Sequence, residues 1–478
     1  MKLLIGAWRW LDERLGFSST IMPVVRHPVP RSVNWWYVTG SATLMAFILQ
    51  VVTGVALATN YVPAPSNAYD SLHFITSQAE FGNILRGMHF FGASAMVVLV
   101  LIHMTQVFMT GSYKFPRELN WLSGVLLLAL TLAMAFTGQL LRWDQNAFWS
   151  TVVGAEQAAR TPIIGGILTK LLIAGKTVGG ATLTRFFAIH VFLIPALIFG
   201  MIGLHLYLAI RHGVSEWPRA GRPVHKATYL QEYEEELKQG EPFFPDAAWK
   251  DAVVMLLVVV AIIALAAIFG PPHLGKPADP TIVQAYPRPD WYFVWYFAVL
   301  ALSPPSIENL VILGFPLLVF LGLALIPLLW PTGERSLRSR PWAPAVVTIP
   351  VILVVVLSVE GFRAPWSPNF AALGASPLPA AVQTQLDPAR QKGAQVFQFR
   401  GCRACHAIAG SGGHKGPDLG AVGDRLTPAQ LTTRIAAGGG GMPAYAGVLS
   451  PAEMQVLVDF LQGLRSPNRE PAGTPLAP

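Results

Sequence analysis

The two cysteines of this sequence belong to one short motif. Cys402, Cys405 and His406 form the pattern C-x-x-C-H. In this pattern both thiols bond covalently to a c-type haem, and the adjacent histidine binds its iron. Because the 478 residues include only these two cysteines, they exclude a disulfide framework, a four-cysteine zinc site and any other cysteine-bound iron–sulfur cluster.

A methionine downstream of this motif would complete the iron coordination, since His/Met ligation is typical of c-type cytochromes. We expect Met442 in this role, because the glycines of the stretch GGGGMPAY let a loop fold over the haem. Met454 lies in a predicted helix, and its alternative role is that of a core residue.

Four more histidines lie within long apolar segments. His89 and His103 are fourteen residues apart in one segment, and His190 and His205 are fifteen apart in another. At 1.5 Å per residue each pair spans roughly 21–22 Å and returns to about the same helix face. Ionisable residues are rare in membrane spans and are usually functional. We therefore expect two bis-histidine b-type haems, with satisfied core histidines or a proton relay as the alternatives.

Glycines repeat this spacing on two other apolar segments, where Gly40 and Gly54, and Gly124 and Gly138, are each fourteen apart. A missing side chain would let the backbone approach the faces of a haem. Ordinary packing between helices is the alternative. Arg86, one turn before the first histidine, is expected to pair with a haem propionate or else to anchor the helix at the membrane interface.

The composition indicates a membrane protein, since 53% of the residues are hydrophobic and 13% are charged, against about a quarter charged in soluble domains. Seven runs are long enough, or nearly so, to cross a bilayer of about 30 Å. They are residues 33–58, 88–110, 119–141, 186–210, 251–269, 309–330 and 343–360, the last interrupted by Pro350. We expect an all-α membrane protein with seven transmembrane helices, a four-helix dihaem bundle and a small all-α cytochrome c domain outside the membrane.

Basic residues suggest how the chain is oriented. They gather before the first span and in the loops after spans two, four and six. The positive-inside rule therefore places the N-terminus in the cytoplasm and the C-terminal domain outside. The net charge of +8 is explained in this way and does not indicate nucleic-acid binding. Residues 1–17 would form an interfacial helix or a frayed terminus, and residues 163–174 a surface or re-entrant helix.

These features divide the chain into five parts. A change to Pro- and Ala-rich sequence after Phe362 marks a linker, and the Pro-, Ala- and Gly-rich C-terminus is expected to be disordered. The parts are 1–215 (dihaem bundle), 216–363 (three further spans), 364–386 (linker), 387–465 (cytochrome c domain) and 466–478 (tail).

Several longer motifs resemble one family. The stretch FGNILRGMHFFGASAMVVLVLIHM, with TGQLLRWDQ and TLTRFFAIH, resembles cytochrome b of the quinol-oxidising bc complexes. The fifteen-residue histidine spacing is similar to the chloroplast-type branch, and GKPADP and PDWY resemble the separate subunit IV of that branch. This resemblance covers about residues 1–363. The C-terminal segment resembles a small class I cytochrome c, whose KGPDL loop would lie against the haem-binding histidine.

The family resemblance gives a role to Pro289-Asp290-Trp291-Tyr292, which lies on the outer side in the predicted topology. The motif resembles the PEWY signature of the outer quinol site, which implies Asp290 as the proton acceptor and Tyr292 as a residue that shapes the site. Family members with the Asp variant include menaquinone users, which favours menaquinol. Read alone, the motif also fits an interfacial aromatic belt with a helix-capping aspartate.

The sequence does not define either quinone site. Arg142 stands where the family usually has proline, so the shape of the outer pocket is uncertain from sequence. For the inner quinone site, Arg211 and His212 are candidates by position only, and solvated loop residues are the alternative.

The expected function is that of the core subunit of a bacterial quinol:cytochrome c oxidoreductase in the cytoplasmic membrane. The resemblance implies a separate Rieske iron–sulfur subunit, because this chain has no cysteine left for such a cluster. It also implies the quinone pool, a periplasmic cytochrome c or other acceptor, and a homodimeric complex. The alternative is a dihaem membrane anchor that relays electrons between the quinone pool and a partner enzyme without bifurcation.

Overall fold

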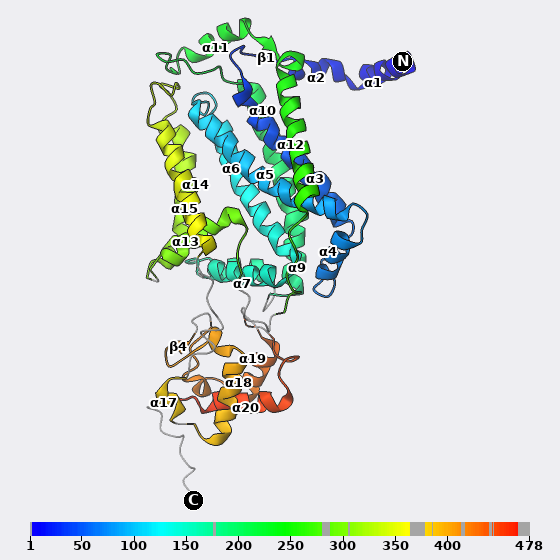
Figure 1. Ribbon diagram of the computed structural model, residues 1–478. Coiled ribbons are helices and arrows are strands. Elements are labelled where there is room, and N and C mark those ends of the chain that lie inside the picture. The colour runs from blue at the N-terminus through cyan, green and yellow to red at the C-terminus, as the bar shows by residue number, and fades with distance from the viewer. Residues whose placement is uncertain are drawn as a thin grey trace, which may run out of the picture.

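The computed structural model describes residues 2–174, 178–279, 287–304, 306–363, 378–384, 386–412, 416–438, 442 and 444–466, and these ranges are largely helical (Figure 1). Most of the predicted linker and tail lies outside them. The N-terminal and bundle helices are α1 (Lys2–Leu15), α2 (Phe17–Val25), α3 (Thr39–Ala58), α4 (Ala68–Ser77), α5 (Gly82–Met109), α6 (Glu118–Gln139), α7 (Gln145–Ala159), α8 (Gly165–Ile173), α9 (Gly180–Ala188) and α10 (Ile194–His212). The later helices are α11 (Tyr229–Lys238), α12 (Ala248–Phe269), α13 (Trp291–Leu302), α14 (Glu308–Leu329), α15 (Ala343–Arg363), α17 (Ala380–Gln383), α18 (Pro388–Phe399), α19 (Pro428–Ala437) and α20 (Pro451–Gly463).

Short irregular helical turns and two small sheets complete the regular structure. The turns are η1 (Trp35–Val38), η2 (Leu140–Arg142), η3 (Ile189–Leu193), η4 (Phe243–Ala247), η5 (Cys402–Ala404) and η6 (Val422–Asp424). Strands β1 (Pro28–Val29) and β2 (Glu241–Pro242) pair antiparallel, with Pro28 opposite Pro242. Strands β3 (Ala407–Ile408) and β4 (Ser411–Gly412) do the same, with Ala407 opposite Gly412.

Seven helical segments of the described chain are long and apolar enough to cross a membrane, so this is a multi-pass membrane protein. They are Trp35–Ala58, Gly82–Met109, Glu118–Arg142, Gly180–His212, Phe243–Phe269, Glu308–Leu329 and Ala343–Arg363. All seven predicted spans are confirmed, and the last is a continuous helix despite Pro350. Helices suit this environment because they satisfy every backbone polar group without water.

The spans pack around one central group of helices. Helix α3 packs against α5, and α10 packs against α6. Helix α12 covers α3 and α5, α14 lies against α6, and α15 contacts α5 (Figure 1). Figure 1 shows α7 lying across one end of this bundle and α11 at the opposite end. We call these the α7 end and the α11 end.

The α7 end is built from short helices. Trp143, Phe148 and Trp149 form its apolar core with residues of α7, α8 and α9. The predicted helix at 163–174 is α8. Helix α13 begins directly after Asp290 and packs against α15, so the loop between spans five and six contains a twelve-residue apolar helix.

The α11 end is built from buried cations that contact the ends of helices. Lys114, Arg117, Arg335 and Arg340 are each at most 6% exposed. Their side chains donate to backbone carbonyls that follow or end the spans, where the helix dipole is negative. These bonds are Lys114–Trp330 (3.0 Å), Arg117–Gly213 (2.9 Å), Arg117–His212 (3.1 Å), Arg335–Thr110 (3.3 Å) and Arg340–Phe108 (2.8 Å).

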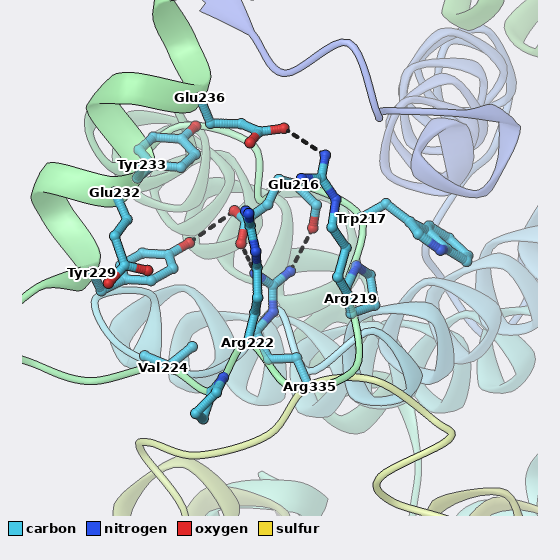
Figure 2. A pocket seen from close by; sticks show the side chains of 12 residues that line it. Glu216, Trp217, Arg219, Arg222, Val224, Tyr229, Glu232, Tyr233, Glu236 and Arg335 are labelled. Carbon is cyan, nitrogen blue, oxygen red and sulfur yellow. Dashed lines mark hydrogen bonds and ion pairs between the residues drawn. The ribbon is translucent and has the colours of Figure 1, made fainter.

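Glu216 supplies a carboxylate to this network. Figure 2 shows the pocket beside it, where Arg335 and Tyr229 both point toward Glu216. Arg335 forms an ion pair with Glu216, and the Tyr229 hydroxyl donates to the same carboxylate at 3.1 Å. Because Arg335 belongs to the loop between α14 and α15, this ion pair joins the later spans to the first four.

The N-terminal helices extend sideways from the bundle at the α11 end (Figure 1). Trp8, Trp10 and Leu15 of α1 are each more than half exposed. A helix that extends sideways from the end of the bundle and exposes tryptophans favours the interfacial reading over a frayed terminus.

The C-terminal unit is a small helical domain with a core of its own. Asp387, Thr427 and Ser450 cap α18, α19 and α20, and each cap is followed by proline at the first helical position. Helices α18 and α20 pack together, with the rings of Phe397 and Phe460 5.7 Å apart.

Replacing Arg117 by methionine should destabilise the bundle by about 2–4 kcal/mol, because it removes three hydrogen bonds from a buried cation and leaves their acceptors unpaired. Thermal unfolding of the detergent-solubilised protein measures this loss. Arg211→Met is the control, since Arg211 is exposed, and it should change stability by less than about 0.5 kcal/mol. Equal effects of the two substitutions would contradict the prediction.

Candidate functional site

The four membrane histidines meet in two pairs at two depths. His89 faces His190 near the α7 end, and His103 faces His205 near the α11 end, with ring centroids 6.3 Å apart in each pair. The paired rings are steeply inclined, at 79° and 77°. An imidazole nitrogen binds a transition metal at about 2 Å and the ring centroid lies about 1 Å behind it, so two rings on opposite sides of one iron lie about 6 Å apart. The observed spacing fits one iron within each pair.

Each imidazole is also held by a hydroxyl on another helix. In three of the four cases the hydroxyl donates its own proton to a carbonyl of its own helix, so it accepts from the imidazole Nδ1–H. This fixes the tautomer and leaves Nε2 free to bind a metal. The Nδ1 contacts are Thr53–His89 (2.9 Å), Thr39–His103 (3.1 Å), Thr137–His190 (3.1 Å) and Ser123–His205 (2.8 Å).

These hydroxyl residues were missed by the sequence analysis. Each stands directly before one of the four spaced glycines, so Thr-Gly or Ser-Gly repeats at fourteen residues on both helices. The repeated Thr-Gly or Ser-Gly dipeptide could therefore have identified the hydroxyls that contact the histidines, which the glycines alone could not.

The glycines themselves lie against the histidine rings. A Cβ at Gly54 would come 3.2 Å from Cε1 of His89, and one at Gly138 would come 2.6 Å from Cε1 of His190. The corresponding approaches at Gly40 and Gly124 are 3.3 Å and 3.6 Å, to the other two rings. The room that glycine provides is therefore used by the imidazoles in the described structure.

An irregular turn explains the unequal histidine spacing. His190 lies in η3, a π-helical turn in which the Ile194 N–H donates to the Ile189 carbonyl. A π turn accommodates one additional residue, so the fifteen-residue separation on this span faces the same direction as the fourteen-residue separation on α5. Pro195 follows immediately and has no N–H to continue the regular α pattern.

Arg86 is buried one turn before His89. Its guanidinium donates to the Thr76 hydroxyl at 3.2 Å and to the Pro272 carbonyl at 2.9 Å. With 6% exposure it lies inside the protein, which does not fit an anchor reaching toward lipid headgroups. Its expected pairing with a haem propionate stays a prediction.

At the α7 end, the PDWY motif and the residues before it are hydrogen-bonded to the end of α6 and to the start of α7. The Asp290 N–H donates to Gln139 Oε1 at 3.2 Å, and Gln139 Nε2 donates to the Arg288 carbonyl at 3.2 Å. Asn146 holds the Arg288 backbone from α7, donating at 3.0 Å and accepting at 2.8 Å. These contacts fix the position of Asp290 relative to the bundle.

The Asp290 side chain is used differently from that of a helix cap. Asp290 stands at the N-cap position of α13, yet its carboxylate accepts no hydrogen bond from the N–H groups of the first turn of that helix. It accepts instead from the Tyr292 hydroxyl at 2.8 Å. Burial raises the pKa of Asp290 above its ordinary value, while the Tyr292 hydroxyl and the Arg142 guanidinium act to lower it. Burial and the neighbouring carboxylate raise the pKa of Tyr292, so the phenol keeps its proton.

Arg142 and Asp144 lie next to this motif. The Arg142 Nε is 3.7 Å from an Asp144 carboxylate oxygen. Asp144 is buried and accepts from the Ala147 N–H at 2.8 Å and the Gly275 N–H at 3.2 Å, which attaches the GKPADP loop to the start of α7.

A second carboxylate lies near the other histidine pair. Asp251 of α12 accepts from the Ser41 hydroxyl at 2.5 Å, and Ser41 directly follows Gly40, which lies against His103. Sequence analysis missed this residue, although an aspartate inside an apolar span was a visible signal. Of the two inner-site candidates, Arg211 is exposed and the His212 carbonyl accepts from Arg117.

The C-x-x-C-H motif forms a turn between α18 and the loop that follows it. The His406 Nδ1–H donates to the Pro417 carbonyl at 2.9 Å, which leaves its Nε2 free. The described part of the KGPDL loop thus lies against His406, as expected, while Lys415 falls outside the described residues. Met442 and Met454 both pack against the domain core.

Comparison with known proteins identifies the family of the chain. Residues 24–213 match the family model described as cytochrome b/b6/petB, and residues 277–376 match cytochrome b (C-terminal)/b6/petD. The cytochrome b subunit of menaquinol:cytochrome c reductase from Bacillus subtilis (strain 168) is 42% identical over 222 residues, which are 45% of this chain and 99% of that protein. This chain belongs to the cytochrome b family. Residues 388–461 add a match to the cbb3-type cytochrome c oxidase subunit III family, so a cytochrome c domain follows the cytochrome b part.

Other similarities cover more of the cytochrome b part. The cytochrome bc complex cytochrome b subunit of Chlorobaculum thiosulfatiphilum is 32% identical over 74% of this chain and 79% of that protein. A chain of a solved hyperthermophilic respiratory Complex III superposes with a TM-score of 0.62 at 27% identity, covering 75% of this chain and 91% of that one. These families carry haem, and the paired imidazoles and the C-x-x-C-H turn fit it.

Replacing Thr137 by valine should raise the reduction potential of one b haem by on the order of 30–60 mV, because an imidazole without its Nδ1 acceptor donates less electron density to iron. Redox titration of the b-haem absorbance measures the shift. Thr131→Val is a matched control, since both threonines are buried on α6 and both donate to the carbonyl four residues earlier. An equal shift in the control would show that the histidine contact is not responsible.

Proposed function

We propose that this chain is the core subunit of a bacterial quinol:cytochrome c oxidoreductase and that quinol is oxidised at the α7 end. The main support is the Asp290 carboxylate, which is held by Tyr292 and lies at the same end as the His89–His190 pair. The similarity to the menaquinol:cytochrome c reductase subunit of Bacillus subtilis favours menaquinol as the substrate.

The proposed haem ligands are those expected from the sequence, and the facing imidazoles support the two histidine pairs. One b haem would be bound by His89 and His190, and the second by His103 and His205. The c haem would be attached to Cys402 and Cys405, with His406 and Met442 as its axial ligands. When bound, the two b haems supply a path for one electron across the membrane, and the c haem supplies the outward path for the other.

The residues around the outer site handle the protons of the reaction. A quinol that is oxidised to a quinone gives up two electrons and two protons, so a proton acceptor must lie beside it. Asp290 is that acceptor: its carboxylate is ionised above its pKa, and Tyr292 orients it through the hydroxyl contact. A side-chain rotation would carry the proton from the quinol toward the aqueous side.

The inner quinone site would lie near the His103–His205 pair. Asp251 is the proposed proton donor for a quinone reduced there, because Ser41 holds its carboxylate beside the residues that back His103. The two histidine levels are about 21 Å apart along α5, so this transfer would be electrogenic.

The remaining parts of the proposal concern the assembly. The N-terminus would be cytoplasmic and the cytochrome c domain would lie outside, on the side of the quinol site. A separate Rieske subunit would take the first electron from quinol, and the complex would be dimeric. A periplasmic cytochrome c or another carrier would accept electrons from the c haem.

Oxidant-induced reduction tests this function. With the inner site blocked by an inhibitor, adding oxidant to the complex with quinol should increase the reduced b-haem absorbance, because removal of the first electron drives the second into the b haems. Asp251→Asn should give the same response without inhibitor. If oxidant instead oxidised the b haems, the chain would be a simple electron relay.

Asp290→Asn should lower quinol oxidation about 100-fold, because an amide cannot accept the proton.

In the wild type the rate should fall as pH falls through the pKa of Asp290, since the protonated acid is inactive as an acceptor. Burial raises that pKa, so this acid limb should lie at higher pH than the ordinary pKa of an aspartate. Steady-state rates across pH check both points, with Asp70→Asn, exposed on α4, as the control that should keep wild-type rates.

A further inference from the structure

We propose that Arg142 is a positioning residue of the outer quinol site, whose guanidinium charge favours the ionised form of the Asp290 carboxylate. This inference rests on the proposed function and assigns a role to a residue that replaces the proline usual in the family. On this proposal, the quinol site depends on the charge of the side chain at position 142 and not only on the size of that side chain.

The backbone places Arg142 beside the PDWY motif. Arg142 ends the η2 turn, which begins directly after Gln139. Gln139 accepts from the Asp290 N–H and donates to the Arg288 carbonyl. The segment that carries the guanidinium is therefore hydrogen-bonded to the segment that carries the carboxylate.

The side chain of Arg142 is only partly neutralised. Its ion pair with Asp144 is long, at 3.7 Å, and Asp144 already accepts from the N–H groups of Ala147 and Gly275. The Arg142 Nε is buried and has no hydrogen-bond partner within the described part of the chain. Its side chain is 20% exposed, so solvent screens the charge incompletely.

Four charged side chains of the described chain interact at this site, and their charges balance only when Asp290 is ionised. These are two cations, Arg86 and Arg142, and two carboxylates, Asp144 and Asp290. Arg142 and Asp144 interact electrostatically both with Arg86 and with Asp290. With proline at position 142 the same group would carry one net negative charge. Arg142 thus compensates the charge that Asp290 must carry to accept a proton.

The groups that face Asp290 act in opposite directions. The Tyr292 hydroxyl of α13 and the Arg142 guanidinium favour the ionised form of Asp290, while burial and the Asp144 charge oppose ionisation. Neither Tyr292 nor Asp144 depends on Arg142 for its position: Tyr292 donates to Asp290, and Asp144 accepts from the Ala147 N–H at the start of α7. Removing the charge of Arg142 should therefore raise the pKa of Asp290.

The experiment compares the pH dependence of quinol oxidation by the whole complex in four forms: wild type, Arg142→Leu, Arg142→Gln and Arg142→Lys. Both neutral variants should move the acid limb of kcat up by about one pH unit, and the lysine variant should stay near wild type. Arg160→Leu is the matched control, because Arg160 pairs with Glu308 at 2.8 Å and is more exposed, and it should leave the limb in place.

A second measurement does not depend on turnover. The infrared band of the protonated Asp290 carboxyl, assigned by its loss in Asp290→Asn, should titrate at higher pH in Arg142→Gln than in wild type. An unshifted band and acid limb in both neutral variants would overturn the inference, as would a lysine variant that behaves like the neutral ones. Failure of the proposed function is distinct: the wild-type complex would then not oxidise quinol, or its acid limb would survive in Asp290→Asn.

Discussion

The hydrogen bonds between membrane imidazoles and hydroxyls of neighbouring helices set the geometry of the bundle. An unpaired polar group in a bilayer costs several kcal/mol, so both nitrogens of each ring need a partner. Thr53 and Thr137 already donate to carbonyls of their own helices, and each can only accept from a ring. Because a glycine follows each hydroxyl, the same turn that pairs Nδ1 also gives the ring room. Nε2 of each ring is then left available to a metal ion between the paired imidazoles.

Arginine has different roles at the two ends of the bundle. At the α11 end, Arg117 and Arg340 donate to carbonyls at the ends of spans, so the cations are part of the scaffold and complement helix dipoles. At the α7 end, the ion pair of Arg142 with Asp144 is long, at 3.7 Å. All three guanidinium nitrogens of Arg117 have hydrogen-bond partners, whereas the Nε of Arg142 has none within the described part of the chain.

The sequence predicted the features that depend on periodicity and hydrophobicity. Seven apolar runs identified the spans, and the facing of His89 and His190 followed from alternating topology. Local backbone changes were not visible in the same way: the π turn at His190 depends on tertiary packing and on Pro195, and no residue type encodes it. The pairing of Asp251 with Ser41 joins residues 210 apart in the chain, which no local pattern reveals.

The surroundings of Asp290 bear on its proposed role as a proton acceptor. Burial favours the protonated form of its carboxyl group, and a protonated acid cannot accept a proton. Three features act against burial: the positive end of the α13 dipole, the Tyr292 hydroxyl and the charge of Arg142. Since the carboxylate makes no capping bond within α13, it remains free to turn from Tyr292 toward another partner without uncapping the helix. A carboxylate stabilised by charge and dipole, and held by one hydroxyl, can therefore ionise and still move.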